Sequence, residues 1–230
     1  AYGVTREDQD LFALSSHKKA TSAIASGRFS DEIHPVQTRV YKGGSWTDVQ
    51  VDTDEGPRAD TNLQALGKLR AVFKQGGTTT AGNSSQVSDG ASATLLMSEE
   101  KAQALGAEVL GSLRSYAVKG VAPEIMGIGP AIAIPAAIEK AGLSLEDIDL
   151  FEINEAFASQ AVYCVRKLGI DPDKVNVNGG AIALGHPLGC TGAKLTATLL
   201  HEMKRRGSRY GVVSMCIGGG MGAAAVFERS

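Results

Sequence analysis

The spacing of apolar and polar residues predicts helices and strands that alternate along most of the chain. At the N-terminal end, Thr5 is a typical helix N-cap and Gly27 a typical stop. Between them, Leu11, Phe12 and Leu14 open an amphipathic helix that runs to about residue 26. Further helices are predicted over residues 61–73, 99–106, 131–142, 155–169 and 188–206. Strands are predicted over residues 33–40, 48–51, 91–97, 108–117, 148–153, 175–177, 210–215 and 223–227. Strands that alternate with helices indicate an α/β layered domain.

The composition is that of an ordinary globular protein with balanced charge. Of the 230 residues, 43% are hydrophobic and 21% are charged, so the chain can bury a sizeable core without disulfides. The 23 Lys and Arg residues against 25 Asp and Glu residues give a net charge of −2, which argues against a nucleic-acid partner. The longest weakly polar stretch, residues 121–138, is interrupted by Glu124 and prolines, so we expect no membrane span. The three cysteines belong to no C-x-x-C motif or Cys/His cluster, so we expect no metal site.

Two segments combine many glycines with few charges. Residues 76–98 carry one charged side chain, Asp89, and open with Gly, Thr, Asn and Ser residues that suit a buried loop facing a ligand or a partner. Residues 171–222 hold 11 of the 28 glycines, which allow a ligand to approach the backbone closely. Three motifs in or near these segments could carry chemistry.

Asn154 opens the first motif, Asn-Glu-Ala-Phe at residues 154–157, where a predicted strand meets a predicted helix. The simpler interpretation is a helix N-cap. The functional interpretation is an amide at the carboxyl end of a strand, where open α/β sheets present their ligands. The motif alone leaves both open.

His186 lies in the second motif, Gly-His-Pro-Leu-Gly at residues 185–189, just before the longest predicted helix of the C-terminal part. A single histidine in a loop is usually a surface residue. Here the two glycines and Pro187 would hold the imidazole in one direction, as a general base requires. Surface residue and catalytic base are equally compatible with this motif.

Cys216 opens the third motif, Cys-Ile-Gly-Gly-Gly-Met-Gly at residues 216–222. A free cysteine at a strand end is often a small buried residue. The alternative is a working thiol beside glycine N–H groups that bind an oxyanion. The run is not a dinucleotide-binding motif, because a strand follows it instead of a helix. Cys164, within a predicted helix, and Cys190, at a helix start, are interpreted as structural.

Arg58 and Ser85 are weaker candidates. Arg58 follows Pro57 in a polar loop, where an arginine is most often a solvated charge. Ser85 lies in the uncharged loop after residue 76. By themselves these residues indicate little.

Together the motifs resemble the thiolase family, whose members make and break carbon–carbon bonds in 3-ketoacyl-CoA thioesters. The likeness rests on residues 154–157, 176–189 and 216–220, with support from 80–85 and 89–91, in an order and spacing that fit over the whole chain. It is greatest toward the plant peroxisomal 3-ketoacyl-CoA thiolases. The resemblance implies an acyltransferase that cleaves 3-ketoacyl-CoA to acetyl-CoA and a shortened acyl-CoA in fatty-acid β-oxidation. It further implies CoA as a substrate, no cofactor, a peroxisomal location and a homodimer of the full-length protein.

The resemblance also implies a fold. Thiolases have two similar βαβαβαββ halves in α-β-α-β-α layers, and a loop domain inserted in the first half covers the CoA site. Residues 1–86 would then be the back part of the loop domain, residues 87–98 the closing strand of the first half, and residues 99–230 the second half. On this map the chain begins inside the loop domain, which would explain its start at Ala-Tyr-Gly instead of Met.

The family's roles transfer to matching positions. His186 would take the proton of a nucleophilic cysteine and help form an oxyanion hole for the thioester oxygen. Asn154 would hold a water in that hole, and Cys216 would be the acid/base that moves a proton to or from the substrate. The N–H of Gly218 would serve a second oxyanion hole. The CoA-contacting positions would be Arg58 and Ser85, with Phe157 lining the pantetheine tunnel.

The chain departs from the family at the acyl-accepting cysteine. Nothing in it matches the short Cys-Ser/Gly-Ser-Gly-like context of that residue, so we expect the chain alone to be inactive. Three alternatives stay open: an acetoacetyl-CoA-forming biosynthetic thiolase, a ketoacyl synthase relative, and a non-catalytic acyl-CoA or lipid-binding protein. A ketoacyl synthase would carry histidine in place of Cys216, and the intact set of His186, Cys216 and Asn154 argues against a carrier.

Overall fold

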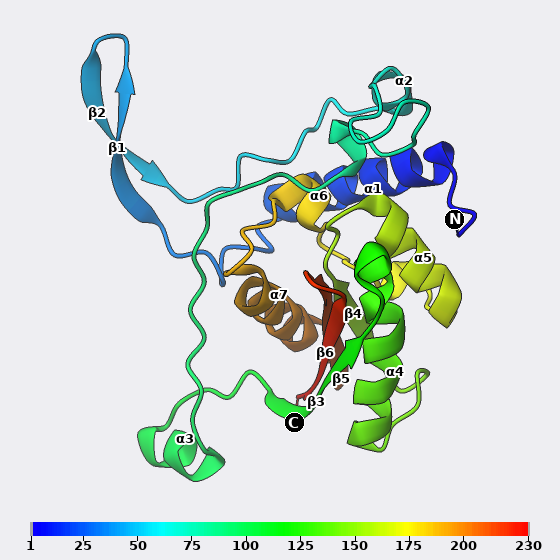
Figure 1. Ribbon diagram of the computed structural model, residues 1–230. Coiled ribbons are helices and arrows are strands. Elements are labelled where there is room, and N and C mark those ends of the chain that lie inside the picture. Colours follow the sequence, from blue (N-terminus) through cyan, green and yellow to red (C-terminus); the bar gives the residue numbers. More distant parts are fainter. Residues whose placement is uncertain (1, 230) are drawn as a thin grey trace.

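A four-stranded mixed sheet forms the centre of the computed structural model, which describes residues 2–229 (Figure 1). The strand order is β3-β6-β5-β4; β4 pairs parallel with β5, and β6 runs antiparallel to both of its neighbours. The strands are β3 (Ser112–Gly120), β4 (Leu150–Ile153), β5 (Tyr210–Ile217) and β6 (Met221–Glu228). The two C-terminal strands lie where the pattern predicted them, and β3 starts four residues later than predicted.

Helices cover both faces of this sheet (Figure 1). On one face lie α4 (Gly129–Ala141) and α5 (Ala158–Leu168), and on the other lies α7 (Thr191–Arg206). The α4 side buries a large cluster that includes Ile134, Phe151 and Val212. The α7 side buries a smaller one. That cluster comprises Leu150, Leu195, Leu199, Leu200, Met203 and Val213.

The local signals for these helices explain their bounds. Helix α4 carries Pro130 in its first turn and ends at Gly142, whose φ of 72° is the left-handed geometry of a helix C-cap. Helix α5 starts three residues later than predicted, because Asn154 to Phe157 form a turn before it. The short helices of this part are η2 (Pro123–Ile128), η3 (Pro172–Lys174) and α6 (Ala181–Leu184).

The N-terminal helix α1 (Arg6–Ala25) begins at the predicted N-cap Thr5, which forms a capping box, and it buries mainly small and polar residues. Leu11 is 47% exposed, and the buried positions are mostly small or polar. They are Gln9, Asp10, Ala13, Ser16, His17, Ala20 and Ala23. The reason is tertiary: Ala20 lets the backbone at Gly179 approach closely, and the hydroxyl of Ser16 bonds to the carboxylate of Glu155. Of the three apolar residues that the pattern singled out, Phe12 and Leu14 are partly buried against a cluster that includes Ala158 and Ile182, whereas Leu11 is largely exposed.

Strands β1 (Val36–Lys42) and β2 (Ser45–Val51) form an antiparallel hairpin that projects from the body (Figure 1). Helix α2 (Leu63–Gly67) is shorter than the predicted 61–73. After it the chain folds back on itself, with Ala71 bridged to Thr80, before the single turn η1 (Ala81–Asn83). Gly76 and Gly77 allow this reversal, which a continued helix would prevent.

Residues 91–97 do not form the predicted strand. They are extended but unpaired, and Leu95 and Leu96 are 83% and 79% exposed. The apolar pattern is that of a strand, but a strand is stable only beside a hydrogen-bonded neighbour, and none lies there among residues 2–229. Helix α3 (Glu99–Leu105) follows, at a distance from the body (Figure 1).

The predicted strand 175–177 is reduced to one bridge, between Val175 and Phe151. Asn176 follows with φ of 45°, a left-handed conformation that ends the strand. Its side chain continues the pairing, because Oδ1 accepts from the N–H of Ile153 at 2.8 Å and Nδ2 donates to the carbonyl of Ile153 at 2.8 Å. An amide side chain thus replaces one residue of a fifth strand.

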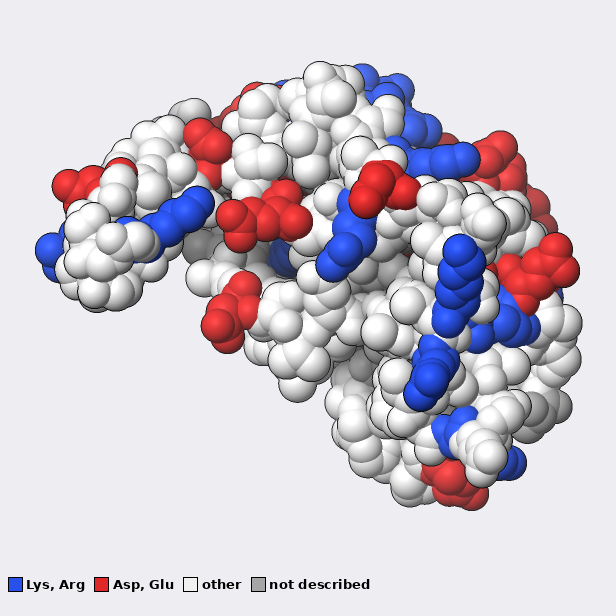
Figure 2. Space-filling view, turned by 90° about the horizontal axis from the view of Figure 1, so that it is seen from above, with Lys and Arg blue, Asp and Glu red and all other residues white. Residues whose placement is uncertain are grey.

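The surface carries both signs of charge side by side on the face drawn in Figure 2, in line with the balanced composition. Within residues 2–229, no helix combines the length and apolar character needed to cross a membrane.

Candidate active site

Asn154 and Cys216 lie at the same edge of the sheet. Asn154 directly follows β4, Cys216 is the penultimate residue of β5, and these strands are parallel neighbours. The N–H of Asn154 donates to the carbonyl of Ser214 at 2.9 Å, which extends the ladder by one residue. This is the carboxyl edge, where α/β sheets present ligands. The sequence prediction that both residues lie at strand ends is confirmed.

His186 reaches Asn154 from the loop between α6 and α7. The Nδ2 of Asn154 lies 3.2 Å from the Nε2 of the imidazole, and the other ring nitrogen, Nδ1, lies 2.7 Å from the hydroxyl oxygen of Thr191. The backbone of the loop is also held, since the N–H of His186 donates to the carbonyl of Gln86 at 3.0 Å. Gly185 permits this path: its φ is 90°, and a Cβ there would lie 2.3 Å from the hydroxyl of Ser88. The imidazole is therefore fixed at both nitrogens and at its backbone.

The protonation states favour a base and an acid at this edge. Burial, followed by the positive charge of Lys194, lowers the pKa of His186, so the neutral imidazole prevails at neutral pH. Burial raises the pKa of the Cys216 thiol, so that side chain keeps its proton. A neutral imidazole accepts a proton and a protonated thiol donates one. These are opposite roles in one site.

Asn154 keeps one polar atom free of protein partners. Its residue is 1% exposed, and its Oδ1 accepts no hydrogen bond from the part of the chain that the structure describes. Burying an acceptor without a donor costs about 1–3 kcal/mol. A water or a ligand donor would satisfy this oxygen, which fits an amide that holds a water beside the imidazole.

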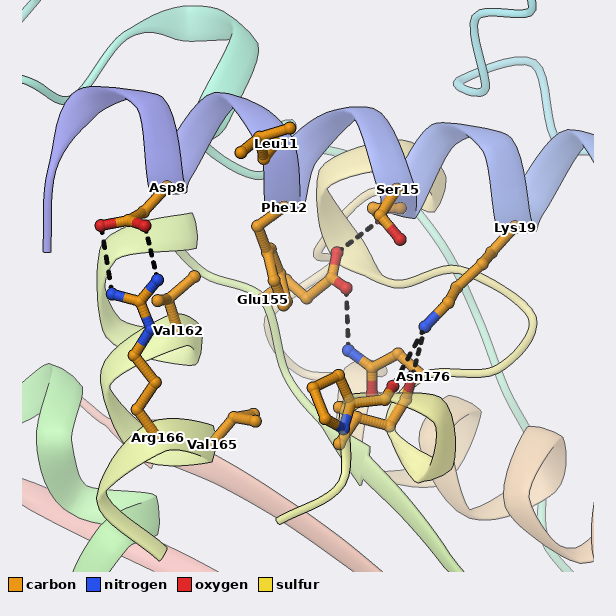
Figure 3. Close-up of a pocket in the computed structure, with 13 residues that line it drawn as sticks. Asp8, Leu11, Phe12, Ser15, Lys19, Glu155, Val162, Val165, Arg166 and Asn176 are labelled. Atoms are coloured by element: carbon orange, nitrogen blue, oxygen red, sulfur yellow. Dashed lines mark hydrogen bonds and ion pairs between the residues drawn. The ribbon is translucent and has the colours of Figure 1, made fainter. Parts of the chain in front are cut away.

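Glu155 anchors the turn that carries Asn154. Its carboxylate is 1% exposed and accepts three hydrogen bonds: from the hydroxyl of Ser16 at 2.7 Å, from Nδ2 of Asn176 at 2.8 Å and from the N–H of Ile182 at 3.1 Å. Figure 3 shows it between α1 above and Asn176 below. Gly180 makes room, because a Cβ there would lie 2.2 Å from the carboxyl carbon. One carboxylate thus joins α1, the turn after β4 and the loop that leads to His186.

A cavity of about 290 Å³ beside Glu155 is lined by residues of α1 and α5 (Figure 3). Leu11, Phe12, Val162 and Val165 give it an apolar wall. Neither His186 nor Cys216 lines it, so it is distinct from the candidate active site.

The loop of residues 80–88 braces both sides of the site. The N–H and the hydroxyl of Ser85 each donate to the carbonyl of Ala156 at 3.0 Å, and Ser84 forms a bridge with Phe157. Phe157 packs edge-on against Phe73, with ring centroids 5.7 Å apart. Ser85 and Phe157, predicted at CoA-contacting positions, therefore lie together. Sequence reasoning missed the backbone contact of this loop with His186, because nothing in the two segments marks them as neighbours.

Arg58 and Gly218 are exposed, and neither is held against His186 or Asn154 by a hydrogen bond in the described part of the chain. The backbone N–H of Arg58 donates to Nδ1 of His17 at 3.1 Å, and its side chain is exposed. Gly218 is exposed in the tight turn between β5 and β6. The CoA and oxyanion roles of these two residues stay predictions.

Cys164 and Cys190 lie as structural cysteines do. Cys164 is buried in α5, where burial raises its pKa to about 12, and its thiol donates to the carbonyl of Gly127 at 3.7 Å. Cys190 caps α7 from a half-buried position. Between residues 2 and 229, no three His, Cys, Asp or Glu side chains are grouped to hold a metal ion.

Family comparisons agree with this geometry. The thiolase C-terminal domain model matches residues 107–229, and the thiolase N-terminal domain model matches residues 1–100. The chain belongs to the thiolase family. Its sheet, with α4 and α5 on one face and α7 on the other, is the thiolase fold.

Similar thiolases come from plants, animals and bacteria. The chain is 64% identical to 3-ketoacyl-CoA thiolase 2, peroxisomal, of Arabidopsis thaliana over 99% of this chain and 50% of the relative. It is 66% identical to 3-ketoacyl-CoA thiolase B, peroxisomal, of Mus musculus over 99% of this chain and 54% of the relative. The chain thus spans about half the length of these curated relatives.

Two solved structures share the fold over nearly all of the chain. Bacillus anthracis acetyl-CoA acetyltransferase superposes with a TM-score of 0.92 at 47% identity, covering 99% of this chain and 57% of that one. Human mitochondrial 3-ketoacyl-CoA thiolase in complex with CoA superposes with a TM-score of 0.88 at 42% identity, covering 99% and 55%. The ketoacyl synthase alternative gains no support from these matches, and the non-catalytic thiolase-like carrier is not tested by them.

Proposed function

We propose that this chain is the acid/base part of a peroxisomal 3-ketoacyl-CoA thiolase, which cleaves 3-ketoacyl-CoA with CoA to acetyl-CoA and a shortened acyl-CoA. The observation that carries the proposal is that Asn154, which is hydrogen-bonded to His186, lies at the same edge of the sheet as Cys216. The relatives named as peroxisomal 3-ketoacyl-CoA thiolases, at 64% and 66% identity, support this reaction and location. The bacterial acetyl-CoA acetyltransferase shares a lower sequence identity of 47%, so it gives weaker support to a biosynthetic direction.

The proposed reaction uses each side chain for one kind of proton transfer. His186 Nε2 takes the proton of the nucleophilic cysteine, which another part of the protein supplies, and the sulfur attacks the 3-keto carbonyl. The C2–C3 bond breaks, its electrons form the enolate of acetyl-CoA, and the thiol of Cys216 protonates that carbon. The Cys216 thiolate then takes the proton of CoA. The CoA sulfur attacks the acyl-cysteine thioester, the bond between the acyl group and the nucleophilic cysteine breaks, and His186 returns the proton to that cysteine. The thiol of Cys216 ends the cycle protonated, as burial favours.

The oxyanion and CoA contacts complete the proposal. Once protonated, His186 Nε2–H can donate to a thioester oxygen beside a water held by Asn154 Oδ1, and the Gly218 N–H serves the second oxyanion. Ser85 and Phe157, which lie together beside the turn after β4, would contact CoA with Arg58. CoA acts as substrate in this scheme, and no cofactor is needed. The unpaired segment 91–97 suits a protein in which a further half, and a second subunit of a homodimer, cover exposed apolar positions.

For the test, this chain is fused to the part of 3-ketoacyl-CoA thiolase B of Mus musculus that it does not cover, and the product is called the joined protein. Thiolysis is measured with 3-ketoacyl-CoA and CoA as substrates. Cys216→Ala should lower thiolysis by about 10²- to 10⁴-fold, the usual contribution of an acid/base group. Cys190→Ser is the matched control, and it should keep wild-type turnover because that thiol takes no part in the scheme. Wild-type turnover in Cys216→Ala would make this cysteine structural and leave a non-catalytic acyl-CoA-binding role.

A further inference from the structure

The hydroxyl of Thr191 is the contact of His186 that the proposed reaction does not use. Thr191 is the first residue of α7 and is 2% exposed. Its Oγ1 lies 2.7 Å from His186 Nδ1 and donates to the carbonyl of Pro187 at 3.0 Å. Behind the imidazole there is thus a buried hydroxyl in place of the carboxylate found behind many catalytic histidines.

The partners at the two ends of this chain of contacts set the direction of its hydrogen bonds. At one end, Nδ2 of Asn154 can only donate, so Nε2 of His186 must offer its lone pair. A neutral imidazole then carries its proton on Nδ1, and that N–H needs an acceptor. At the other end, the hydroxyl of Thr191 gives its single hydrogen to the carbonyl of Pro187 and turns a lone pair toward Nδ1. Both ends require the same tautomer.

We propose that Thr191 is a positioning residue that holds His186 as the Nδ1–H tautomer, with the lone pair of Nε2 turned toward the site at Asn154 and Cys216. This inference rests on the proposed function for its catalytic meaning, but the tautomer is a property of the chain itself. Burial of Thr191 excludes water as a substitute acceptor for Nδ1–H. The amide of Asn154 is too weak an acid to protonate Nε2, so the lone pair is oriented and stays available to a thiol.

The loop geometry supports a positioning role over a merely local one. The carbonyl of Pro187 also accepts the N–H groups of Cys190 and Thr191 at 2.8 and 2.9 Å, so it belongs to the first turn of α7. The imidazole is thereby tied to the start of a 16-residue helix whose apolar face packs on the sheet. The hydroxyl of Thr191 thus links the loop residue His186 to a helix that is packed against the core.

Two variants separate the hydroxyl from the volume of the side chain. Thr191→Val keeps the shape and removes the acceptor, whereas Thr191→Ser keeps the acceptor and removes a methyl group. The first readout is the ring ¹⁵N spectrum of histidine-labelled 230-residue chain, with the His186 signals assigned from their loss in His186→Gln. Wild type and Thr191→Ser should show the Nδ1–H tautomer, and Thr191→Val should show a mixture or the Nε2–H form.

The second readout is thiolysis by the joined protein. Thr191→Val should lower kcat by about 10- to 100-fold, as loss of an orienting partner behind a functional histidine does in metal sites, with the KM for CoA unchanged. Thr191→Ser should recover most of the rate. An Nε2–H tautomer in the wild type overturns the inference, as does a Thr191→Val protein with wild-type spectrum and rate.

The two readouts distinguish failure of this inference from failure of the proposed function. A wild-type Nδ1–H tautomer that is lost in Thr191→Val, together with a folded but inactive joined protein, would uphold the role of Thr191 and reject the thiolase activity. An active joined protein with no effect of Thr191→Val would do the opposite. If Thr191→Val fails to fold, the wild-type and Thr191→Ser spectra still decide the tautomer.

Discussion

Replacing Glu155 by glutamine should weaken the junction of α1 with the active-site loops. The carboxylate accepts from Ser16 and Ile182 on Oε2 and from Asn176 on Oε1. A glutamine can place its one oxygen in only one of these positions. If it keeps the Ser16 and Ile182 bonds, its NH₂ group faces the Nδ2 donor of Asn176, which was 2.8 Å from the carboxylate.

The size of the effect follows from this count. One hydrogen bond to a charged group is lost, worth about 1.5–3 kcal/mol, and a buried donor is left unpaired. Burial raises the pKa of Glu155, so removing the charge recovers part of the desolvation cost. We expect a net loss of about 2 kcal/mol in the free energy of unfolding, or roughly 4–8 °C in Tm for a chain of this size.

Glu152→Gln is the matched control. Glu152 is 3% exposed three residues earlier, and burial raises its pKa well above the usual range. No hydrogen bond reaches its carboxylate from residues 2–229, in contrast to Glu155. Glu152→Gln should therefore leave stability unchanged within about 1 kcal/mol or raise it, because the desolvation cost that is removed exceeds the attraction of Lys194. Urea unfolding followed by circular dichroism measures both variants. Equal stability of the two variants would refute the assigned network at Glu155.

Two further changes test the electrostatics and the core. Burial raises the pKa of Glu32 to about 7, against the opposing effects of Thr198, Lys194 and Arg205. The folded state therefore binds more protons than the unfolded state between about pH 4.5 and 7, so the free energy of unfolding falls as pH rises through this window. Glu32→Gln should remove that fall, which amounts to roughly 3 kcal/mol, and urea unfolding at pH 5 and pH 8 checks it; an identical pH dependence in both proteins would reject the assignment. Leu199 is 1% exposed between α7 and the sheet, and Leu199→Ala should lower the free energy of unfolding by about 2–5 kcal/mol in the same assay. Leu188 is 80% exposed, and Leu188→Ala should lower it by less than about 0.5 kcal/mol. Similar losses at both positions would contradict the packing described.

The α/β part of the fold was largely predictable because its signals are local. Pro130 and Gly142 bracket α4, and the alternation of strands and helices predicted the order of elements after residue 106. The same reasoning placed Asn154 and Cys216 at the ends of predicted strands, and the structure adds that these strands are parallel neighbours.

Other parts depend on contacts that no local pattern reveals. Residues 91–97 have the apolar pattern of a strand but no hydrogen-bonding neighbour in the described chain. The buried face of α1 is polar because Ser16 bonds to Glu155, 139 positions away in the sequence. Asn176 pairs with a strand through its side chain, and Thr191 contacts His186 from the start of a helix. The hydrophobic periodicity of the sequence does not predict any of these polar contacts.

Formation of acetyl-CoA by the joined protein is the decisive measurement for the proposal that this chain is the acid/base part of a 3-ketoacyl-CoA thiolase. A protein that combines this chain with the uncovered part of the mouse thiolase is purified, checked for folding by its melting curve, and incubated with 3-ketoacyl-CoA and CoA. We expect CoA-dependent release of acetyl-CoA and a shortened acyl-CoA by the joined protein, and no turnover by the 230-residue chain alone. A folded joined protein that releases no acetyl-CoA, or turnover by the chain by itself, would contradict it.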